Sequence, residues 1–209
     1  MRVVVFGASG ATGRELVAQA LVQGHHVTAF VRNASRLGIG SGEVNVVQGD
    51  VTDSSAVARA VEGQNAVLCA LGAATPLRRD RTLVEGVRHI VDAMERRGTR
   101  RLVYLSFLGV REGRRQLSFV GRVIVPRLLH NVVADHEAKE AIIRERGLDW
   151  VIVRPPRLTN GPRRGVYRHG VGIRATSLIP RISRADLADF MLRQISSDTY
   201  VHNTPAVMY

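Results

Sequence analysis

The sequence predicts an α/β fold: a single doubly wound domain with a mainly parallel sheet and helices on both faces. Short apolar segments alternate with segments of helical periodicity along most of the 209 residues, the pattern of repeated β-α-β units. The hydrophobic fraction of 45% is enough to fill the two core layers of such a sheet. Neither an internal repeat nor a linker divides the chain, so we expect one domain over residues 1–209.

The first half of the chain alternates strand and helix signals. Apolar runs predict strands over residues 2–6, 26–31, 44–47 and 66–71. The last of these runs is continuously apolar, as expected for a central strand that is covered on both faces. Apolar side chains at helical spacing predict helices over residues 11–23, 54–61 and 80–97.

The second half continues the same pattern with two interruptions. It predicts strands over residues 101–106 and 150–153, helices over residues 135–145 and 184–195 (or from Ser183), and a closing strand in the tail 206–209. Residues 107–131 and 157–181 fall outside the alternation, and each stretch follows the carboxyl end of a strand. Because ligands bind at that edge of open α/β sheets, we expect both stretches to be substrate-binding lids.

Apolar side chains are frequent in the first of these lid segments, between residues 119 and 129. They are expected either to cover a flat aromatic substrate or to belong to the core or to a dimer face. The sequence leaves these alternatives open.

A glycine-rich turn follows the first predicted strand and opens the first predicted helix. It consists of Gly7, Ala8, Ser9, Gly10, Ala11, Thr12 and Gly13. Gly7 allows a tight turn, Gly10 lets the backbone approach a pyrophosphate, and Gly13 lets the helix pack closely on the sheet. The N–H groups at the start of the helix then point toward the phosphates. Because strand, turn and helix occur in the required order, this turn predicts a Rossmann-type domain that binds a dinucleotide.

The end of the second strand indicates which dinucleotide is bound. An acidic residue at this position holds the ribose of NAD, whereas an arginine suits the 2′-phosphate of NADP. The sequence here is Val31-Arg32-Asn33, without an acidic residue, and Arg36 follows closely. We therefore expect NADP(H) as the cofactor, held by Arg32 with help from Arg36.

Two further segments are expected to contact the cofactor. Asp50 and Asp53 follow the third strand, and we expect one of them to cap the next helix and the other to accept from the adenine amino group. Val51 is placed to pack on the adenine ring, and Leu71 with Gly72, after the fourth strand, lets the backbone approach the middle of the cofactor.

These motifs together resemble the atypical short-chain dehydrogenases with an NAD(P)-binding domain, and in particular their flavin reductase (biliverdin-IXβ reductase) type, with NmrA-like proteins as more distant relatives. The resemblance covers nearly the whole chain and is carried by Gly7 to Gly13, Arg32, Gly49-Asp50, Leu71-Gly72, Ser106, Arg154-Pro155-Pro156 and Ser183-Arg184-Ala185-Asp186. It implies that Ser106 and His136 lie near the nicotinamide and that Pro155 packs on its ring.

The sequence departs from this family at two positions. Ordinary short-chain dehydrogenases have a catalytic tyrosine four residues before a lysine, and here Asp135 stands four residues before Lys139. A second histidine of the flavin reductase type is replaced by Arg157. The second replacement weighs against reduction of a biliverdin-like tetrapyrrole.

Three residues are the catalytic candidates. Ser106 ends the fifth strand, where its hydroxyl is expected to bond a substrate carbonyl or the nicotinamide amide. His136 is expected to donate a proton or bind an anionic group, or else to be an exposed histidine at a helix start. Lys139 is the only lysine beside 29 arginines, and because arginine cannot replace a compact ammonium, we expect Lys139 to touch the nicotinamide ribose or the substrate.

Charge and cysteine content bound the partners. The net charge is +12, but the basic residues are spread along the chain and are nearly all arginine, which argues against specific nucleic-acid binding and for anionic ligands. The single cysteine, Cys69, and a first strand that begins at residue 2 predict a cytoplasmic protein. No membrane contact and no metal site are expected, and the protein is expected to be a monomer or homodimer.

The sequence therefore predicts an NADPH-dependent reductase that transfers hydride to a flavin, quinone or similar conjugated small molecule. The alternative is a non-catalytic NADP(H) sensor of the NmrA-like kind, which acts through a protein partner. The missing tyrosine favours the sensor, and Ser106, His136 and Lys139 favour the reductase.

Overall fold

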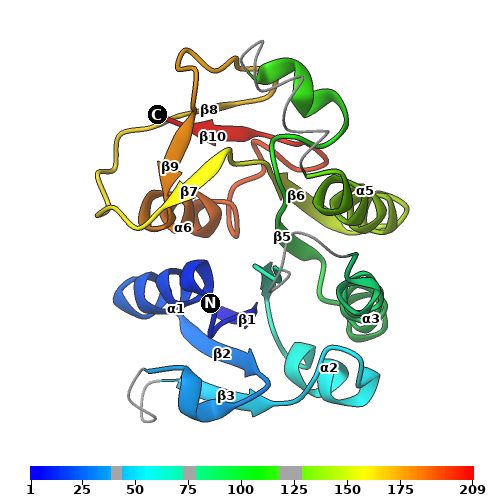
Figure 1. Ribbon diagram of the computed structural model, residues 1–209. Helices are drawn as coiled ribbons and strands as arrows, with labels where there is room; N and C mark the ends of the chain where they lie inside the picture. Colours follow the sequence, from blue (N-terminus) through cyan, green and yellow to red (C-terminus); the bar gives the residue numbers. More distant parts are fainter. Residues whose placement is uncertain (39–43, 73–78, 118–128) are drawn as a thin grey trace.

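The computed structural model describes residues 1–38, 44–72, 79–117 and 129–209. Its centre is a six-stranded sheet in which every neighbouring pair of strands is parallel, in the order β3-β2-β1-β4-β5-β6 (Figure 1). The strands are β1 (Arg2–Phe6), β2 (His26–Val31), β3 (Val44–Gln48), β4 (Ala66–Cys69), β5 (Arg101–Leu105) and β6 (Asp149–Val153). The strand order reverses direction between β1 and β4, which is the place where open α/β sheets bind ligands.

Helices cover both faces of the sheet, as predicted. They are α1 (Ala11–Val22), α2 (Ser54–Val61), α3 (Arg81–Arg97), α5 (His130–Arg144) and α6 (Arg184–Arg193), with 3-10 helices η1 (Ala34–Arg36) and η2 (Arg111–Gln116). Helix α1 packs beside α6 on one face, and α2, α3 and α5 lie side by side on the other (Figure 1).

The alternation of side chains along β1 explains these two layers. Val3 and Val5 point into the core beneath α1 and α6, whereas Val4 and Phe6 point into the core beneath α2, α3 and α5. All four side chains are fully buried. A strand covered on both faces therefore reads as an unbroken apolar run in the sequence.

Several boundaries differ from those predicted by one or more residues. Strand β4 ends at Cys69 rather than at residue 71. The next two residues, Ala70 and Leu71, line a pocket at this edge of the sheet. Helix α5 begins at His130, five residues before the predicted start. Its N-cap is Leu129, which makes no side-chain capping bond. No capping residue marks this start in the sequence. Most of the apolar cover predicted between residues 119 and 129 lies outside the described residues.

The segment predicted as the second lid forms small strands beyond the end of β6. Strand β7 (Arg157–Thr159) pairs in parallel with β9 (Arg181–Ser183), and β8 (Arg168–Gly170) pairs antiparallel with β10 (Ala206–Met208) (Figure 1). The predicted closing strand therefore exists, but it pairs with β8 instead of extending the main sheet. Two isolated parallel bridges link the tail to β6 and its end, from Asn203 to Val151 and from Ala206 to Arg154.

None of the helices in the described part of the chain combines the length and the apolar character needed to cross a membrane.

Candidate functional site

The glycine-rich turn has the tight geometry that the sequence predicts. Gly7 has a φ of +80°, and a Cβ atom there would lie 2.6 Å from the carbonyl oxygen of Ala70. A Cβ atom at Gly13 would lie 2.0 Å from the carbonyl oxygen of Gly7, so α1 packs directly on the turn. The predicted structural roles of Gly7 and Gly13 are confirmed. The approach of Gly10 to a pyrophosphate stays a prediction.

The start of α1 is left open for an anion. Gly10 is the N-cap, and within the described part of the chain no side-chain capping bond is formed to the first N–H groups of the helix. Such groups bear a partial positive charge and bind phosphates readily. The turn thus fits the pyrophosphate of a dinucleotide without rearrangement of a capping side chain.

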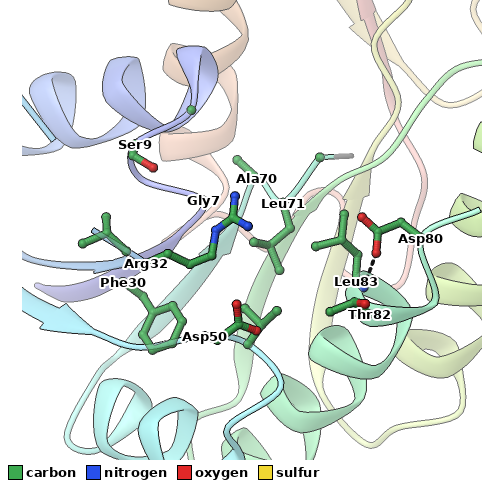
Figure 2. A pocket seen from close by; sticks show the side chains of 14 residues that line it. Gly7, Ser9, Phe30, Arg32, Asp50, Ala70, Leu71, Asp80, Thr82 and Leu83 are labelled. Carbon is green, nitrogen blue, oxygen red and sulfur yellow. Dashed lines mark hydrogen bonds between the residues drawn. The ribbon is translucent and has the colours of Figure 1, made fainter. Parts of the chain in front are cut away.

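A pocket of about 380 Å³ lies in front of this turn, within the usual range of small-molecule sites (Figure 2). It is lined by Gly7, Ser9, Gly10, Phe30, Val31, Arg32, Asp50, Val51, Ala70, Leu71, Gly72, Asp80, Thr82 and Leu83. Most of the predicted cofactor-binding residues are therefore brought together: Gly7, Ser9, Gly10, Arg32, Asp50, Val51, Leu71 and Gly72.

The other predicted cofactor residues lie outside the pocket lining. Ala11, Thr12 and Gly13 form the first turn of α1 behind the glycine loop. Arg36 is exposed at the end of η1, where its carbonyl oxygen accepts a hydrogen bond from Nη2 of Arg14 at 2.8 Å. Pro155 is buried, and its carbonyl oxygen accepts a hydrogen bond from the N–H of Leu108.

Arg32 and Asp50 define the polar end of the pocket. Figure 2 shows the Arg32 side chain reaching into the pocket on the side of Asp50. Hydrogen bonds from the backbone and side chain of Thr52 lower the pKa of Asp50, and the charge of Arg32 adds to this effect. Among the described residues, the guanidinium of Arg32 has no hydrogen-bond or ion-pair partner. Its charge is available to an anionic ligand.

The neighbouring Asp53 has the other role that the sequence assigns to this pair. Its side chain caps α2 by accepting hydrogen bonds from the N–H groups of Ser55 and Ala56 at 2.9 and 3.1 Å. The expectation that one aspartate caps is confirmed. The contact of Asp50 with an adenine amino group stays a prediction, supported by its place in the pocket lining.

Sequence reasoning missed the side of the pocket formed by α3. Asp80 is the N-cap of α3 and accepts a hydrogen bond from the N–H of Leu83, and Thr82 lies between them (Figure 2). The N-cap signal of Asp80 was readable in the sequence, but its closeness to β4 was not. Phe30 and Val31 of β2 and Ala70 complete the missed lining.

The three catalytic candidates lie further along the same edge of the sheet. Ser106 follows β5, the strand beside β4, and His136 and Lys139 lie one turn apart on α5. None of the three is part of the pocket lining described above. Of the three, Lys139 is close enough to Asp80 of that lining for their charges to interact.

Ser106 is held by a buried ion pair. Its hydroxyl donates to Oε1 of Glu140 at 2.6 Å, and Arg154 donates to the same carboxylate through Nε at 3.0 Å and Nη2 at 2.6 Å. The side chains of Glu140 and Arg154 are completely buried. Nη1 of Arg154 also contacts Glu112 in η2 at 2.8 Å, so the pair joins β5, α5, β6 and η2.

His136 is bonded to a tyrosine from the sheet. Nδ1 of His136 lies 3.2 Å from the hydroxyl of Tyr104, which is fully buried on β5. Burial, together with the charge of Lys139, lowers the pKa of His136 well below its usual value. The imidazole is therefore neutral near pH 7 and partly buried, not the exposed histidine considered as an alternative.

Lys139 is buried without a counter-ion at bonding distance. Its exposed fraction is 2%, and within the part of the chain that the structure describes it forms no hydrogen bond or ion pair. Burial lowers its pKa, and the charges of nearby groups, including Asp135 and Asp80, oppose that shift. A buried ammonium that lacks a bonded partner is a strong candidate for contact with a ligand.

The position of the missing tyrosine has a structural role instead. Asp135 is buried, and its Oδ2 accepts a hydrogen bond from the N–H of Asp80 at 2.8 Å. It thereby joins the start of α3 to α5. Within the described ranges, no group of three His, Cys, Asp or Glu side chains is placed to hold a metal ion.

Comparison with known proteins gives a family match over most of the chain. Residues 7–198 match the model of a family described as NAD(P)H-binding. An uncharacterised chloroplastic protein of Arabidopsis thaliana is 30% identical over 181 residues, covering 78% of this chain and 61% of that protein. Uncharacterised proteins of Mycobacterium tuberculosis and Mycobacterium bovis are 30% identical over 156 residues, which is 74% of this chain but 14% of their own length.

Solved structures share the fold. An anaerobilin reductase from Escherichia coli O157:H7 has a TM-score of 0.81 at 21% identity, with 99% of this chain and 96% of that chain covered. A short-chain dehydrogenase/reductase from Veillonella parvula, solved in complex with NADP, has a TM-score of 0.80 at 20% identity, with 99% and 93% covered. The predicted doubly wound architecture is confirmed, its fold is shared with a solved short-chain dehydrogenase/reductase, and the family match confirms the expected NAD(P)-binding domain.

Proposed function

Because this chain belongs to the NAD(P)H-binding family, we propose that it is an NADPH-dependent reductase that passes hydride to a flavin, quinone or similar conjugated small molecule. The observation that carries the proposal is the pairing of an uncapped glycine turn with an unpartnered Arg32 in one pocket. The turn suits a pyrophosphate, and the arginine suits a 2′-phosphate on the adenosine ribose.

Residues of this chain hold the cofactor in the proposed complex. The turn from Gly7 to Gly13 bonds the pyrophosphate, Arg32 with Arg36 binds the 2′-phosphate, and Asp50 with Val51 holds the adenine. Leu71 and Gly72 border the middle of the cofactor, and Pro155 packs at the nicotinamide end. The bound cofactor supplies the hydride, and the protein contributes the relative position of the two reactants.

The catalytic candidates act at the nicotinamide end in this proposal. Lys139 binds the nicotinamide ribose or the substrate through its otherwise unpartnered ammonium. His136 is neutral, so it serves as a hydrogen-bond donor rather than as a cationic acid. Conjugated acceptors tolerate the absence of the family's tyrosine, because their reduced forms take up a proton from water.

The names of relatives support a reductase. A 3-diazoavenalumate denitrifying reductase from Streptomyces is 39% identical over 117 residues, covering 51% of this chain and 38% of that enzyme. The bacterial structure that shares the fold across 99% of this chain is named an anaerobilin reductase. Both names are those of reductases, which is the type of reaction proposed here.

A non-catalytic NADP(H) sensor is the second candidate. The observation in its favour is that Asp135, which replaces the family's tyrosine, is bonded to the backbone of Asp80 and joins two helices. In this role, a protein partner would bind the cofactor-bound and cofactor-free states of the chain with different affinity. Steady oxidation of NADPH in the presence of flavins or quinones distinguishes the reductase from the sensor.

The first experiment is calorimetric titration of the protein with NADPH and NADH. Arg32→Ala is expected to weaken NADPH binding about 30-fold, the scale of a lost charge-assisted hydrogen bond, and to leave NADH binding nearly unchanged. Arg59→Ala removes an exposed arginine on α2 and is the matched control. Equal affinity of the unmodified protein for both cofactors would overturn the NADP preference.

A further inference from the structure

The hydroxyl of Ser106 donates its proton in a hydrogen bond to Glu140. Oγ lies 2.6 Å from Oε1 of Glu140, and the backbone N–H of Ser106 is bonded to the carbonyl oxygen of Val153 at 2.8 Å. Glu140 is completely buried, and Ser106 is 5% exposed. The polar capacity that remains at Ser106 Oγ consists of its unused lone pairs.

The surroundings of Glu140 determine the direction of that hydrogen bond. Arg154 donates to both carboxylate oxygens, and Nη2 of Arg144 lies 3.5 Å from Oε2. A carboxylate that receives two arginine donors in a buried site is ionised, and an ionised carboxylate can only accept. The proton between Ser106 and Glu140 must therefore come from the serine.

We propose that Ser106 is a hydrogen-bond acceptor in the active site, and that Glu140 is a positioning residue that keeps Ser106 an acceptor by binding its proton. This inference rests on the proposed reductase function and deepens it. A hydroxyl in this state cannot polarise a substrate carbonyl, because it has no proton to donate. It selects instead for an amide N–H at the reacting end of the site.

Two ligands present such an N–H group. One is the carboxamide of the nicotinamide, and the other is the ring imide N–H of a flavin-like acceptor. Quinones carry no such donor. The chemistry recognised is the same in both ligands, and separate measurements identify which of them Ser106 contacts.

Stability alone gives a weak account of the buried charges. Burying an ion pair costs desolvation energy, and the attraction between the two charges roughly balances this cost. Apolar side chains of similar volume therefore stabilise a core equally well. Here the pair joins the residue after β5 to the residue after β6, and Glu140 directly follows Lys139 in the chain. The Glu140–Arg154 pair therefore lies where it can hold the Ser106 hydroxyl in place as an acceptor for a ligand.

The cofactor arm compares NADP+ with its 3-acetylpyridine analogue, in which a methyl group replaces the carboxamide NH2 and the carbonyl is retained. Calorimetry of the unmodified protein is expected to show about 5-fold weaker binding of the analogue, the scale of one hydrogen bond. Ser106→Ala is expected to remove this discrimination. Affinity for 2′-phospho-ADP-ribose, which lacks the nicotinamide, is expected to stay unchanged in the variant.

The substrate arm compares lumiflavin with N3-methyllumiflavin as acceptors for NADPH oxidation. If Ser106 contacts the acceptor, the methylated flavin has a KM raised about 5-fold in the unmodified protein, and Ser106→Ala removes the difference. A quinone is the control acceptor, and its KM is expected to be the same in both proteins. Discrimination in either arm supports the proposal and names the ligand.

Glu140→Gln tests the positioning role, because the amide supplies one acceptor where the carboxylate supplies two and turns an N–H toward Arg154 or Ser106. It is expected to remove the same discrimination as Ser106→Ala, and the two changes together are expected to add nothing further. Glu137→Gln on the same helix, paired with the half-exposed Arg114, is the matched control. Should Glu140→Gln fail to fold, Arg154→Lys with the same two ligand pairs replaces it.

Retention of the unmodified protein's discrimination by Ser106→Ala, or its absence from the unmodified protein in both arms, would overturn the inference. Ser106 would then merely tie β5 to α5. The outcomes are separate from those of the reductase proposal. Calorimetric discrimination without turnover of any acceptor would overturn the reductase and keep the inference, whereas turnover without discrimination would do the reverse.

Discussion

The hydroxyl of Tyr104 lies 3.2 Å from Nδ1 of His136, and this contact holds the imidazole ring in place. Burial, together with nearby Cys69, Glu140 and Asp135, raises the pKa of Tyr104 well above its usual value. The phenol therefore stays protonated, so it can donate to Nδ1. When it does, the N–H of the neutral imidazole is at Nε2, where a ligand can accept from it.

Replacing Tyr104 with phenylalanine tests this arrangement. Tyr104→Phe is expected to lower kcat/KM for the conjugated acceptor about 10-fold, because His136 loses the hydrogen bond that holds its ring, while stability changes by about 1 kcal/mol. Steady-state kinetics and urea unfolding measure the two effects. Tyr200→Phe is the matched control, since its hydroxyl lies 2.9 Å from Nδ1 of His169 away from the pocket. Equal losses of activity in both variants would contradict the assignment.

The lowered pKa of His136 predicts a pH dependence of stability. The unfolded chain takes up a proton near pH 6.5, whereas the folded protein does so only well below that value. The free energy of unfolding is thus at its full value above pH 6.5, where His136 is neutral in both states. As the pH falls from there toward the folded-state pKa, the free energy of unfolding decreases by up to about 1.4 kcal/mol per pH unit. Urea unfolding between about pH 7.5 and about pH 5 is expected to show a flatter profile for His136→Gln. His26→Gln, at an exposed histidine, should leave the profile as it is.

Gly13 is expected to tolerate no side chain. The Cβ atom of Gly13→Ala would meet the carbonyl oxygen of Gly7 at 2.0 Å and the Cα atom of Ala8 at 2.7 Å. Separating α1 from the turn is expected to cost about 3 kcal/mol and to abolish NADPH binding. Gly147→Ala, where nothing lies within 4 Å, is the control and is expected to change stability by less than about 0.5 kcal/mol. A stable Gly13→Ala protein would show that the turn can shift.

Two neighbouring aspartates are expected to separate stability from binding. Asp53→Ala removes the cap of α2 and is expected to cost about 1 kcal/mol in urea unfolding, with NADPH affinity unchanged. Asp50→Ala is expected to weaken NADPH binding several-fold with a smaller loss of stability, because Asp50 lines the pocket and bonds only Thr52. Reversal of the two effects would contradict the roles assigned here.

The fold and the pocket in front of the glycine turn could be predicted because their signals are local. The apolar run of β1, the glycines at positions 7, 10 and 13, and Arg32 lie within one β-α-β unit, where spacing along the chain determines spacing in the structure. The Asp53 cap was equally readable. Each of these features depends on residues that are close together in the sequence.

The rest of the site depends on contacts between distant elements. Asp80 meets Asp135 across 55 positions, and Ser106 meets Glu140 across 34. Ser106 could be singled out from the sequence, but not the loss of its donor capacity, since that follows from Glu140 and Arg154 lying against it. Periodicity indicates which face of a helix is buried and leaves its polar partners undetermined.

All the described residues that line the pocket in front of the glycine turn precede position 84 in the chain, whereas Ser106, His136 and Lys139 all follow position 100. In the proposed function, the preference for one dinucleotide and the choice of acceptor are thus encoded in separate stretches of the gene. A crossover after the helix that ends at Arg97 would exchange one property without touching the residues of the other. Relatives with this fold are therefore expected to combine cofactor preference and substrate independently, and recombination between them is a direct route to new reductases.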